Sequence, residues 1–224
     1  MAIEPSPLEW VTIKTTLPAL PLPLLKDRIE LRTDRLVLRQ TRASDLDSWH
    51  ALRIQPEVMR WTGQGAPDPD LEWSKDKLQS RLSPQGDKTF DFAVCLAETG
   101  EMIGVAGSHM MVGELGWPVI GYMLRKEFWG KGYATELVHA FLAAWWALPR
   151  AEVDIKVEKS TAVERKDGRV RECIVAVTLD SNTSSQRVLS KAGMELVRAW
   201  SEADRQQENG HSILYGFVTH KPTT

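Results

Sequence analysis

The stretch Tyr122–Glu136, YMLRKEFWGKGYATE, joins an expected strand to an expected helix through a turn that contains Gly130 and Gly132. A turn of this kind presents backbone N–H groups beside the positive end of a helix dipole, which favours a phosphate group. Glycine at both positions lets the backbone approach a diphosphate that a Cβ atom would hold away. Two glycines also suit a tight connection that binds nothing, so the pair alone leaves both interpretations open.

Two established phosphate-binding motifs do not fit this turn. A dinucleotide fingerprint requires a third glycine where Thr135 stands, and a P-loop requires GxxxxGK followed by Ser or Thr, which occurs nowhere in the chain. The turn therefore points to phosphate chemistry of another kind.

The elements that position this turn follow from hydrophobic periodicity and from Gly and Pro. After Gly132, apolar residues recur at the three- and four-residue spacing of a buried helix, from Ala134 to Leu148. Runs that alternate or are apolar predict strands over Arg35–Thr41, Thr89–Ala97, Met102–Met111, Val119–Arg125, Ile174–Leu179, Met194–Ser201 and His211–Thr219. Further helices are expected over Asp45–Ile54, Pro69–Leu82 and Asn182–Ala192, and turns at Thr99-Gly100 and Asn209-Gly210.

The composition narrows the class of protein. The chain has 224 residues, a formal net charge of −2, 42% hydrophobic and 26% charged residues, which is typical of a globular protein and excludes a globally basic nucleic-acid binder. Cys95 and Cys173 form neither a disulfide framework nor a metal-ligand pair. The sequence offers no membrane span and no secretory signal, so a cytoplasmic location is expected.

The N-terminal 28 residues contain five prolines, and Thr15–Leu25 alternates Leu with Pro. Proline removes backbone donors, so we expect an extended arm over residues 1–28 followed by a single domain over residues 29–224.

The turn and two other segments resemble the GNAT superfamily of N-acetyltransferases. Gly130-Lys131-Gly132-Tyr133-Ala134 resembles the acetyl-CoA motif Q/R-x-x-G-x-G/A, and FWGKGYATE is similar to the branch that acetylates ribosomal-protein N-termini and assorted amines. The segment from Asn182 to Met194 resembles the N-x-x-S-x-x-V-L-x-K-x-G-F helix of that branch. Arg35–Arg39 resembles its first strand, and the order of elements agrees from about residue 30 to residue 219.

The resemblance implies an α/β (α+β) fold: a mixed, mostly antiparallel sheet splayed between its fourth and fifth strands and flanked by about four helices. Acetyl-CoA would lie in the split as co-substrate, without a metal. Its pantetheine arm would pair with the backbone of Met123, Leu124 and Arg125 and bond Asn182, with Ser185 on the same helix face. Its pyrophosphate would sit on the N–H groups of Trp129, Gly130, Lys131, Gly132, Tyr133, Ala134 and Thr135. The outer phosphate would meet Lys131, Arg187 or Lys191.

The chain departs from this family pattern at three points. Glu127 stands at the Q/R position, which a contact made through backbone N–H tolerates. Leu189 stands where many relatives carry a tyrosine that protonates the thiolate. The 50 residues from Gly132 to Asn182 exceed what the helix, turn and strand between them require. The surplus, about residues 151–172, contains the alternating Val153–Val157 and an Asp167-Gly168 turn, so it predicts a β-hairpin before the fifth strand. It would cover the substrate opening, form a homodimer interface, or be a neutral insertion.

The resemblance implies transfer of an acetyl group to a primary amine within a ternary complex. Backbone N–H near Met123 and Leu124 could stabilise the oxyanion, and Ser185 would protonate the thiolate. Glu114 and either Glu202 or Asp204 are candidate bases, with Asp91 a weaker one.

The amine class can be narrowed by an energy argument. Neutralising a lysine amine at pH 7 costs ~4.6 kcal/mol and an α-amine only ~1 kcal/mol, so a protein N-terminus or a small-molecule amine is favoured. The alternative is a catalytically silent CoA-binding or interaction module. No basic cluster supports a nucleic-acid partner, and no segment supports a membrane.

Overall fold

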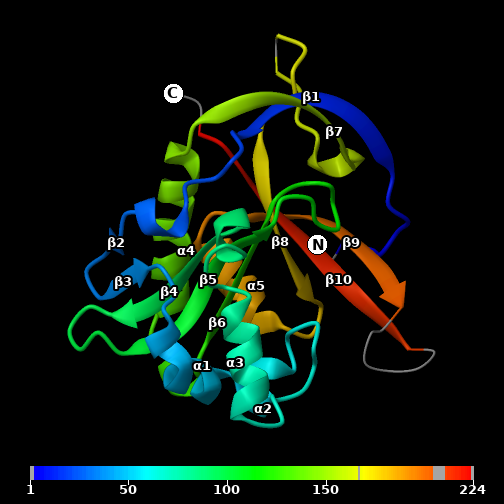
Figure 1. Ribbon diagram of the computed structural model, residues 1–224. Helices are drawn as coiled ribbons and strands as arrows, with labels where there is room; N and C mark the ends of the chain where they lie inside the picture. Colours follow the sequence, from blue (N-terminus) through cyan, green and yellow to red (C-terminus); the bar gives the residue numbers. More distant parts are fainter. Residues whose placement is uncertain (1–2, 166, 204–209, 223–224) are drawn as a thin grey trace. The chain divides into compact units, whose positions relative to one another are not determined.

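The computed structural model describes residues 3–165, 167–203 and 210–222 (Figure 1). The chain divides into two units, each built from segments that are not contiguous in sequence. The first unit contains Met1–Leu20, Met110–Ile120 and Trp146–Thr224, and the second contains Pro21–His109 and Gly121–Trp145. The chain passes from the first unit to the second at Leu20, inside the segment predicted as an arm, and the boundary at residue 28 stays a prediction.

Five strands follow one another in the sheet order β2-β3-β4-β5-β6. They are β2 (Leu31–Arg32), β3 (Leu36–Arg39), β4 (Phe90–Leu96), β5 (Met102–Met110) and β6 (Val119–Leu124). The first four pair antiparallel. The β4–β5 hairpin turns at Gly100, whose φ of 74° is the left-handed conformation that favours glycine. The predicted hairpin over these two strands is confirmed.

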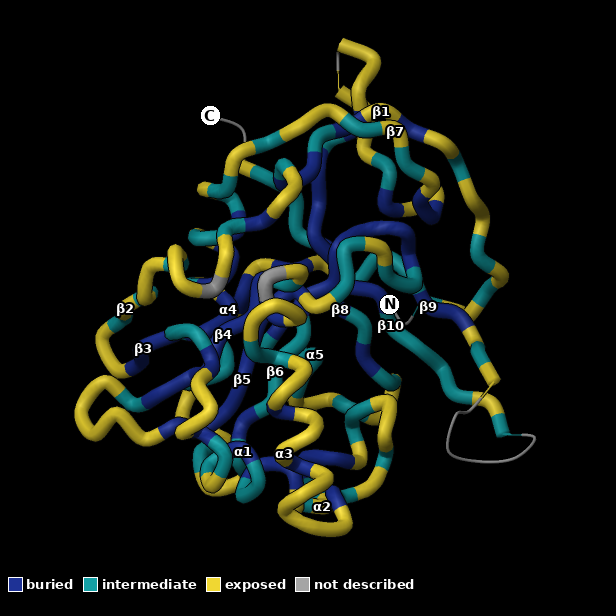
Figure 2. Tube along the Cα trace, viewed as in Figure 1, coloured by how far each residue is buried: buried dark blue, intermediate teal, exposed yellow. Residues whose placement is uncertain are grey.

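Helices of the second unit cover both faces of strand β4. They are α1 (Leu46–Arg53), α2 (Pro56–Met59), α3 (Leu71–Gln79) and α4 (Tyr133–Ala147). Trp49 of α1 and Leu78 of α3 pack in one apolar cluster with Cys95 of β4. The Phe90 ring, on the opposite face, lies 6.0 Å from the Trp145 ring of α4. Successive strand residues point to opposite faces, so β4 is buried nearly throughout (Figure 2).

In the first unit the sheet order is β6-β8-β10-β9, with β8 (Cys173–Leu179), β9 (Glu195–Ala203) and β10 (His211–His220). Strand β10 pairs antiparallel with β8 and β9, and β6 pairs parallel with β8 at Val119 and Val175. Helix α5 (Thr183–Lys191) completes five α-helices in the described ranges, where about four were expected. The mixed, mostly antiparallel sheet is the one that the resemblance implies. Of the Asn209-Gly210 turn, Asn209 lies outside the described residues.

A separate two-stranded sheet pairs β1 (Trp10–Pro18) with β7 (Arg150–Glu158). The alternation over Val153–Val157 therefore predicts a strand correctly, but its partner is the N-terminal segment and not the second half of a local hairpin. The reason is that β1 also alternates: Ile13 and Leu17 are buried in a cluster with Trp117 and Val157. Pro18 ends β1, where its missing donor costs no ladder bond.

The Asp167-Gly168 turn signal is confirmed, in a shorter hairpin that follows β7. The Arg165 N–H donates to the Arg169 carbonyl (2.7 Å) and the Arg171 N–H to the Val163 carbonyl (2.8 Å). Gly168 has a φ of 77°. The surplus of about residues 151–172 is thus one strand of the two-stranded sheet plus this hairpin.

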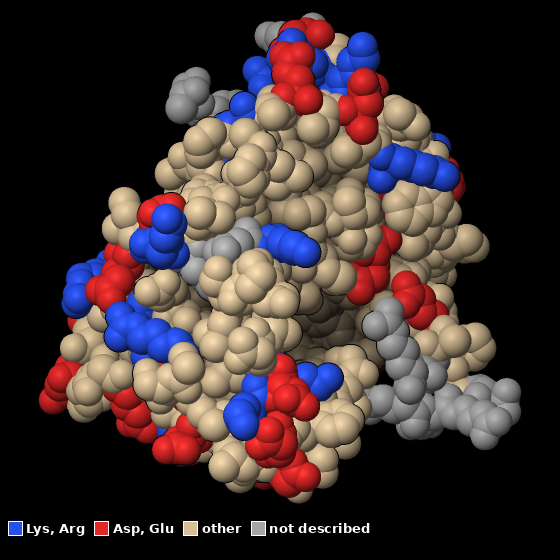
Figure 3. Space-filling model, viewed as in Figure 1, with Lys and Arg blue, Asp and Glu red and all other residues tan. Residues whose placement is uncertain are grey.

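Surface charges of both signs are interspersed on the face drawn in Figure 3. Among the helices of the described residues, none combines the length and the apolar character that a membrane crossing demands.

Candidate acetyl-CoA site and its relatives

The glycine turn has the backbone conformation that its sequence predicts. Strand β6 ends at Leu124, a short 3-10 turn spans Lys126–Phe128, and α4 begins at Tyr133. Gly130 and Gly132 have φ angles of 73° and 81°, which side chains rarely adopt. A Cβ atom built on Gly130 would meet nothing within 4 Å. The turn therefore requires glycine for its conformation and leaves open space beside Gly130.

The backbone N–H groups of residues 129–135, expected to bind the pyrophosphate, differ in whether they already have a partner. The Trp129 N–H donates to the Lys126 carbonyl (3.1 Å), so it already has a partner in the turn, and its role toward the pyrophosphate stays a prediction. The intrahelical pattern of α4 begins with Glu136, whose N–H donates to the Gly132 carbonyl (3.1 Å). The N–H groups at the start of a helix have no partner within it, and those of Tyr133, Ala134 and Thr135 are in this position. The suitable donors thus begin after Trp129.

An ion pair between Arg35 and Glu136 braces the turn. The Arg35 Nε donates to Glu136 Oε2 (2.8 Å), and its Nη1 donates to the Lys131 carbonyl (2.9 Å). The guanidinium lies 4.6 Å from the centre of the Tyr133 ring. The Thr33 hydroxyl donates to Glu136 Oε1 (2.5 Å). Partial burial alone would raise the pKa of Glu136, but the hydrogen bonds from Thr33 and Arg35 outweigh it and lower the pKa.

Sequence reasoning did not assign this brace. Arg35 belongs to the strand that resembles the family, and Glu136 to the string FWGKGYATE, but 101 residues separate them. An ion pair over that separation leaves no local pattern in the sequence.

Glu127, the departure from the Q/R position, has local partners. Its carboxylate accepts hydrogen bonds from the Gln55 amide (2.8 Å) and from Arg125 (2.7 Å to Nη2). Burial would raise the pKa of Glu127, but its own backbone N–H, Gln55 and Arg125 together lower it. The side chain therefore stabilises the approach to the turn as an anion, and leaves the N–H groups beyond Trp129 untouched.

The backbone of β6 offers fewer groups to a pantetheine arm than expected. The Arg125 N–H donates to the Ile103 carbonyl of β5 (2.9 Å), and the Met123 carbonyl lies against Gly104 of β5. Backbone groups alternate between the two edges of a strand, so those of Leu124 point to the other edge. There the Leu124 carbonyl accepts the Trp129 indole N–H (2.7 Å). The Leu124 N–H therefore points away from β5, and the roles of Met123, Leu124 and Arg125 toward the pantetheine arm stay predictions.

Helix α5, in the first unit, begins as its sequence predicts. Asn182 is the N-cap, and its Oδ1 accepts the Ser185 N–H (3.2 Å). Leu189 is fully buried, so its side chain belongs to the core, whereas Lys191 is exposed. Ser185 is half-buried and takes part in an interaction of its own. The roles of Asn182, Ser185 and Lys191 toward acetyl-CoA stay predictions.

The candidate carboxylates differ in how far they are engaged. Glu114 lies in the β5–β6 loop of the first unit, and its Oε2 is buried without a hydrogen-bond partner among the described residues. Glu202 on β9 accepts the Trp200 indole N–H (2.7 Å). Asp91 is buried and ion-paired with Arg81, which is a structural role. Asp204 lies outside the described residues.

Residues 35–195 match the family described as "Acetyltransferase (GNAT) domain". The chain belongs to the GNAT acetyltransferase family, and membership implies acetyl transfer that depends on acetyl-CoA. It is 30% identical over 154 residues to an uncharacterized N-acetyltransferase, p20, of Bacillus licheniformis, which covers 63% of this chain and 85% of the relative.

Solved structures share the fold. A GNAT-family acetyltransferase from Bacillus anthracis has a TM-score of 0.65 at 20% identity, covering 86% of this chain and 99% of that one. The ribosomal-protein-S5-alanine acetyltransferase of Vibrio fischeri has a TM-score of 0.60 at 15% identity, covering 87% and 97%. The microcin C7 self-immunity acetyltransferase MccE, solved with acetyl-CoA and AMP, has a TM-score of 0.60 at 15% identity, covering 84% and 93%. At these identities the likeness shows the fold alone.

Proposed function

We propose that this protein is an N-acetyltransferase that moves the acetyl group of acetyl-CoA directly to a primary amine within a ternary complex. The observation that carries the proposal is the turn at Gly130 and Gly132. Its two left-handed glycines open onto the N-terminus of α4, and the Arg35–Glu136 ion pair holds it in that conformation.

The turn fits the diphosphate of acetyl-CoA. The open space at Gly130 admits a phosphate group close to the backbone, and the first N–H groups of α4 supply donors with the favourable end of the helix dipole. The exposed Lys131 ammonium adds a positive charge beside them. Arg187 and Lys191, exposed on α5, are the other candidates for the outer phosphate. The edge of β6 at Leu124 would receive the pantetheine arm.

Glu114 is the best-supported general base. Its Oε2 is buried without a hydrogen-bond partner among the described residues, so this oxygen has an acceptor position left for an N–H of the substrate ammonium. Glu202 is less suited, since its carboxylate already accepts the Trp200 indole N–H (2.7 Å). A base positioned in this way contributes typically 10²–10⁴ in rate.

Ser185 is proposed to protonate the departing thiolate. Leu189, at the usual position of the acid, has no proton to give and is buried. Ser185 stands in the first turn of α5, where the helix dipole favours developing negative charge. Its backbone N–H holds the Asn182 cap, so the hydroxyl is not needed for the cap.

The acceptor is proposed to be an amine of low pKa, either a protein α-amino group or a small-molecule amine. Deprotonating an α-amine at pH 7 costs ~1 kcal/mol against ~4.6 kcal/mol for lysine. A single base such as Glu114, whose Oε2 is buried without a partner among the described residues, then has only the smaller cost to meet.

A thiol-release assay tests the proposal. Acetyl-CoA is offered with a panel of N-terminal peptides, small amines and a peptide whose only amine is a lysine. We expect turnover with the first two groups. Stabilisation by acetyl-CoA without thiol release from any amine would support the catalytically silent module instead.

A further inference from the structure

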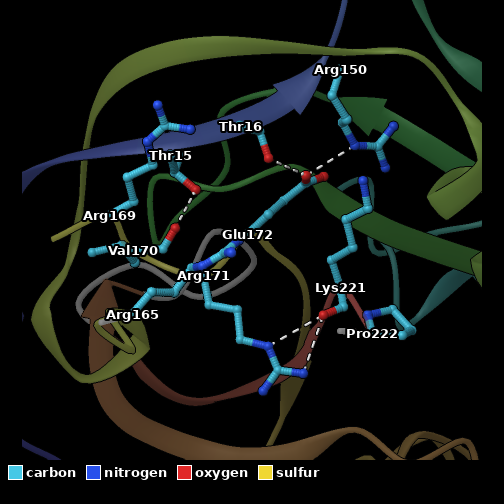
Figure 4. Close-up of a pocket in the computed structure, with 10 residues that line it drawn as sticks. All are labelled: Thr15, Thr16, Arg150, Arg165, Arg169, Val170, Arg171, Glu172, Lys221 and Pro222. Atoms are coloured by element: carbon cyan, nitrogen blue, oxygen red, sulfur yellow. Dashed lines mark hydrogen bonds and ion pairs between the residues drawn. The ribbon is translucent and has the colours of Figure 1, made fainter. Parts of the chain in front are cut away.

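A cavity of about 260 Å³ lies in the first unit (Figure 4), and none of its described lining residues belongs to α5 or to the β5–β6 loop. Its walls come from β1, the start of β7, residues 165 and 169–172 of the hairpin segment, and the residues after β10. Five of its lining side chains are cationic: Arg150, Arg165, Arg169, Arg171 and Lys221. One lining side chain, Glu172, is anionic.

The hairpin holds its arginines in place through backbone contacts. The Val170 N–H donates to the Lys14 carbonyl (2.9 Å), and the Thr15 hydroxyl donates to the Val170 carbonyl (2.8 Å). Arg169 and Arg171 flank this anchored residue. The Arg171 guanidinium donates to the Lys221 carbonyl through Nε (3.2 Å) and Nη2 (3.1 Å), as Figure 4 shows. The cations are therefore brought together by the fold from three separate segments.

The carboxylates nearby compensate only part of these charges. Glu172 is buried, and its Oε2 accepts from Arg150 (2.9 Å) and from Thr16 (2.9 Å). Its Oε1 is buried without a hydrogen-bond partner among the described residues, and the charges of both Arg150 and Lys221 act on this carboxylate. Exposed ion pairs join Arg169 to Glu152 and Arg165 to Asp167. Among the described residues, the five lining cations and these three carboxylates leave an excess of two positive charges, and exposed ion pairs neutralise little of the field.

We propose that this cavity binds a compact anion that carries a phosphate group. A phosphate monoester bears close to two negative charges at pH 7, which equals the excess. Guanidinium forks and an ammonium from several directions suit a tetrahedral group with three free oxygens, whereas a planar carboxylate needs one fork. The volume lies below the range of about 300–1,000 Å³ typical of pockets for drug-sized ligands, so the ligand is small.

The test compares inorganic phosphate with chloride at equal ionic strength, by calorimetry and by melting temperature. Acetyl-CoA is present at saturation, so that the turn at Gly130 and Gly132 does not take up the phosphate. Binding of acetyl-CoA is measured first, so a failure of the proposed function is seen before phosphate is added.

The decisive variant is Lys221→Met. Its backbone N–H still donates to the Glu172 carbonyl and its carbonyl still accepts from Arg171, so the wall is kept and the ammonium is lost. We expect phosphate affinity to fall about tenfold, and Arg169→Met to have a similar effect. The control is Lys14→Met. Lys14 is an exposed lysine on β1, and its neighbour Thr15, not Lys14, is the buried residue that contacts the hairpin. This variant should bind phosphate as the parent does.

Two results would overturn the proposal. One is a phosphate effect equal to that of chloride, or equal in Lys221→Met and the parent. The other is binding of a labelled single-stranded RNA that Lys221→Met weakens while inorganic phosphate does not compete, which would make the cavity part of a nucleic-acid surface.

Discussion

Replacing Gly130 by aspartate separates a phosphate-binding turn from a mere connection, because the chain offers a matched control. Gly130 and Gly100 have φ angles of 73° and 74°, and a Cβ atom on either would meet nothing within 4 Å. The two substitutions should therefore lower the free energy of unfolding by a similar amount, about 1–2 kcal/mol or less, because Asp tolerates the left-handed backbone conformation. Gly100 lies in the β4–β5 turn, which no phosphate is expected to reach.

The size of the expected effect follows from charge and mass action. A unit negative charge about 4 Å from a phosphate charge costs ~1 kcal/mol in water and ~4 kcal/mol at an effective dielectric of 20. Acetyl-CoA at 100 times the parent Kd stabilises the fold by about 2.7 kcal/mol. If Gly130→Asp raises Kd about 100-fold, the remaining stabilisation is ~0.4 kcal/mol. The parent and Gly100→Asp should thus gain roughly 5–10 °C in Tm, and Gly130→Asp about 1 °C.

The assay is a melting curve of each variant with and without acetyl-CoA at one fixed concentration. Comparing the shifts, and not the absolute Tm values, removes the strain that both variants share. An equal shift in Gly130→Asp and Gly100→Asp would refute the argument and leave the turn as a connector.

The remaining predictions concern the brace and the proton transfers. Glu136→Gln should raise the Kd of acetyl-CoA several-fold. In the parent, the contribution of Glu136 to acetyl-CoA binding should be present above its ordinary pKa of about 4.3 and should be lost as the pH falls through its lowered native pKa. A Kd that is equal in both proteins from pH 3 to 7 would contradict this prediction. Glu114→Gln should lower kcat by about 10²–10⁴ without lowering Tm, since the amide keeps the shape of the side chain and removes its charge and its basicity; activity near that of the parent excludes Glu114 as the base. Ser185→Ala should lower kcat by a similar factor at unchanged acetyl-CoA affinity, with the exposed Ser184→Ala as control, and equal turnover of both would remove Ser185 from the mechanism.

The sequence predicts most of the structure that is formed by residues close together in the chain. Alternation and turn chemistry place the β4–β5 hairpin and the two glycines of the turn, and the Asn182 cap is visible as a residue type before a helix. The brace between Arg35 and Glu136 is not predictable, because a side chain that crosses from one strand to a distant helix leaves no periodic signal.

The pairing of β1 with β7 was missed for a related reason. Prolines around residues 18–23 indicate an arm, and they do end the strand at Pro18, but the alternation of Ile13, Thr15 and Leu17 before them is enough to form a sheet. The strand that pairs with β1 cannot be predicted from its own residues, because the pairing depends on where the rest of the fold places β7.

The same pairing sets an order for synthesis of the chain. Trp10 pairs with Glu158 and Pro18 with Arg150, so β1 leaves the ribosome about 130–150 residues before its partner. At roughly 5–20 residues per second this is about 7–30 s, during which an amphipathic strand has no neighbour. Unpaired strands of this kind invite pairing with other chains, and Lys14 on the exposed face and the terminal Pro18 are residues that oppose it. The first unit can fold only after its last strand has been made, whereas the second is complete once residue 145 has emerged.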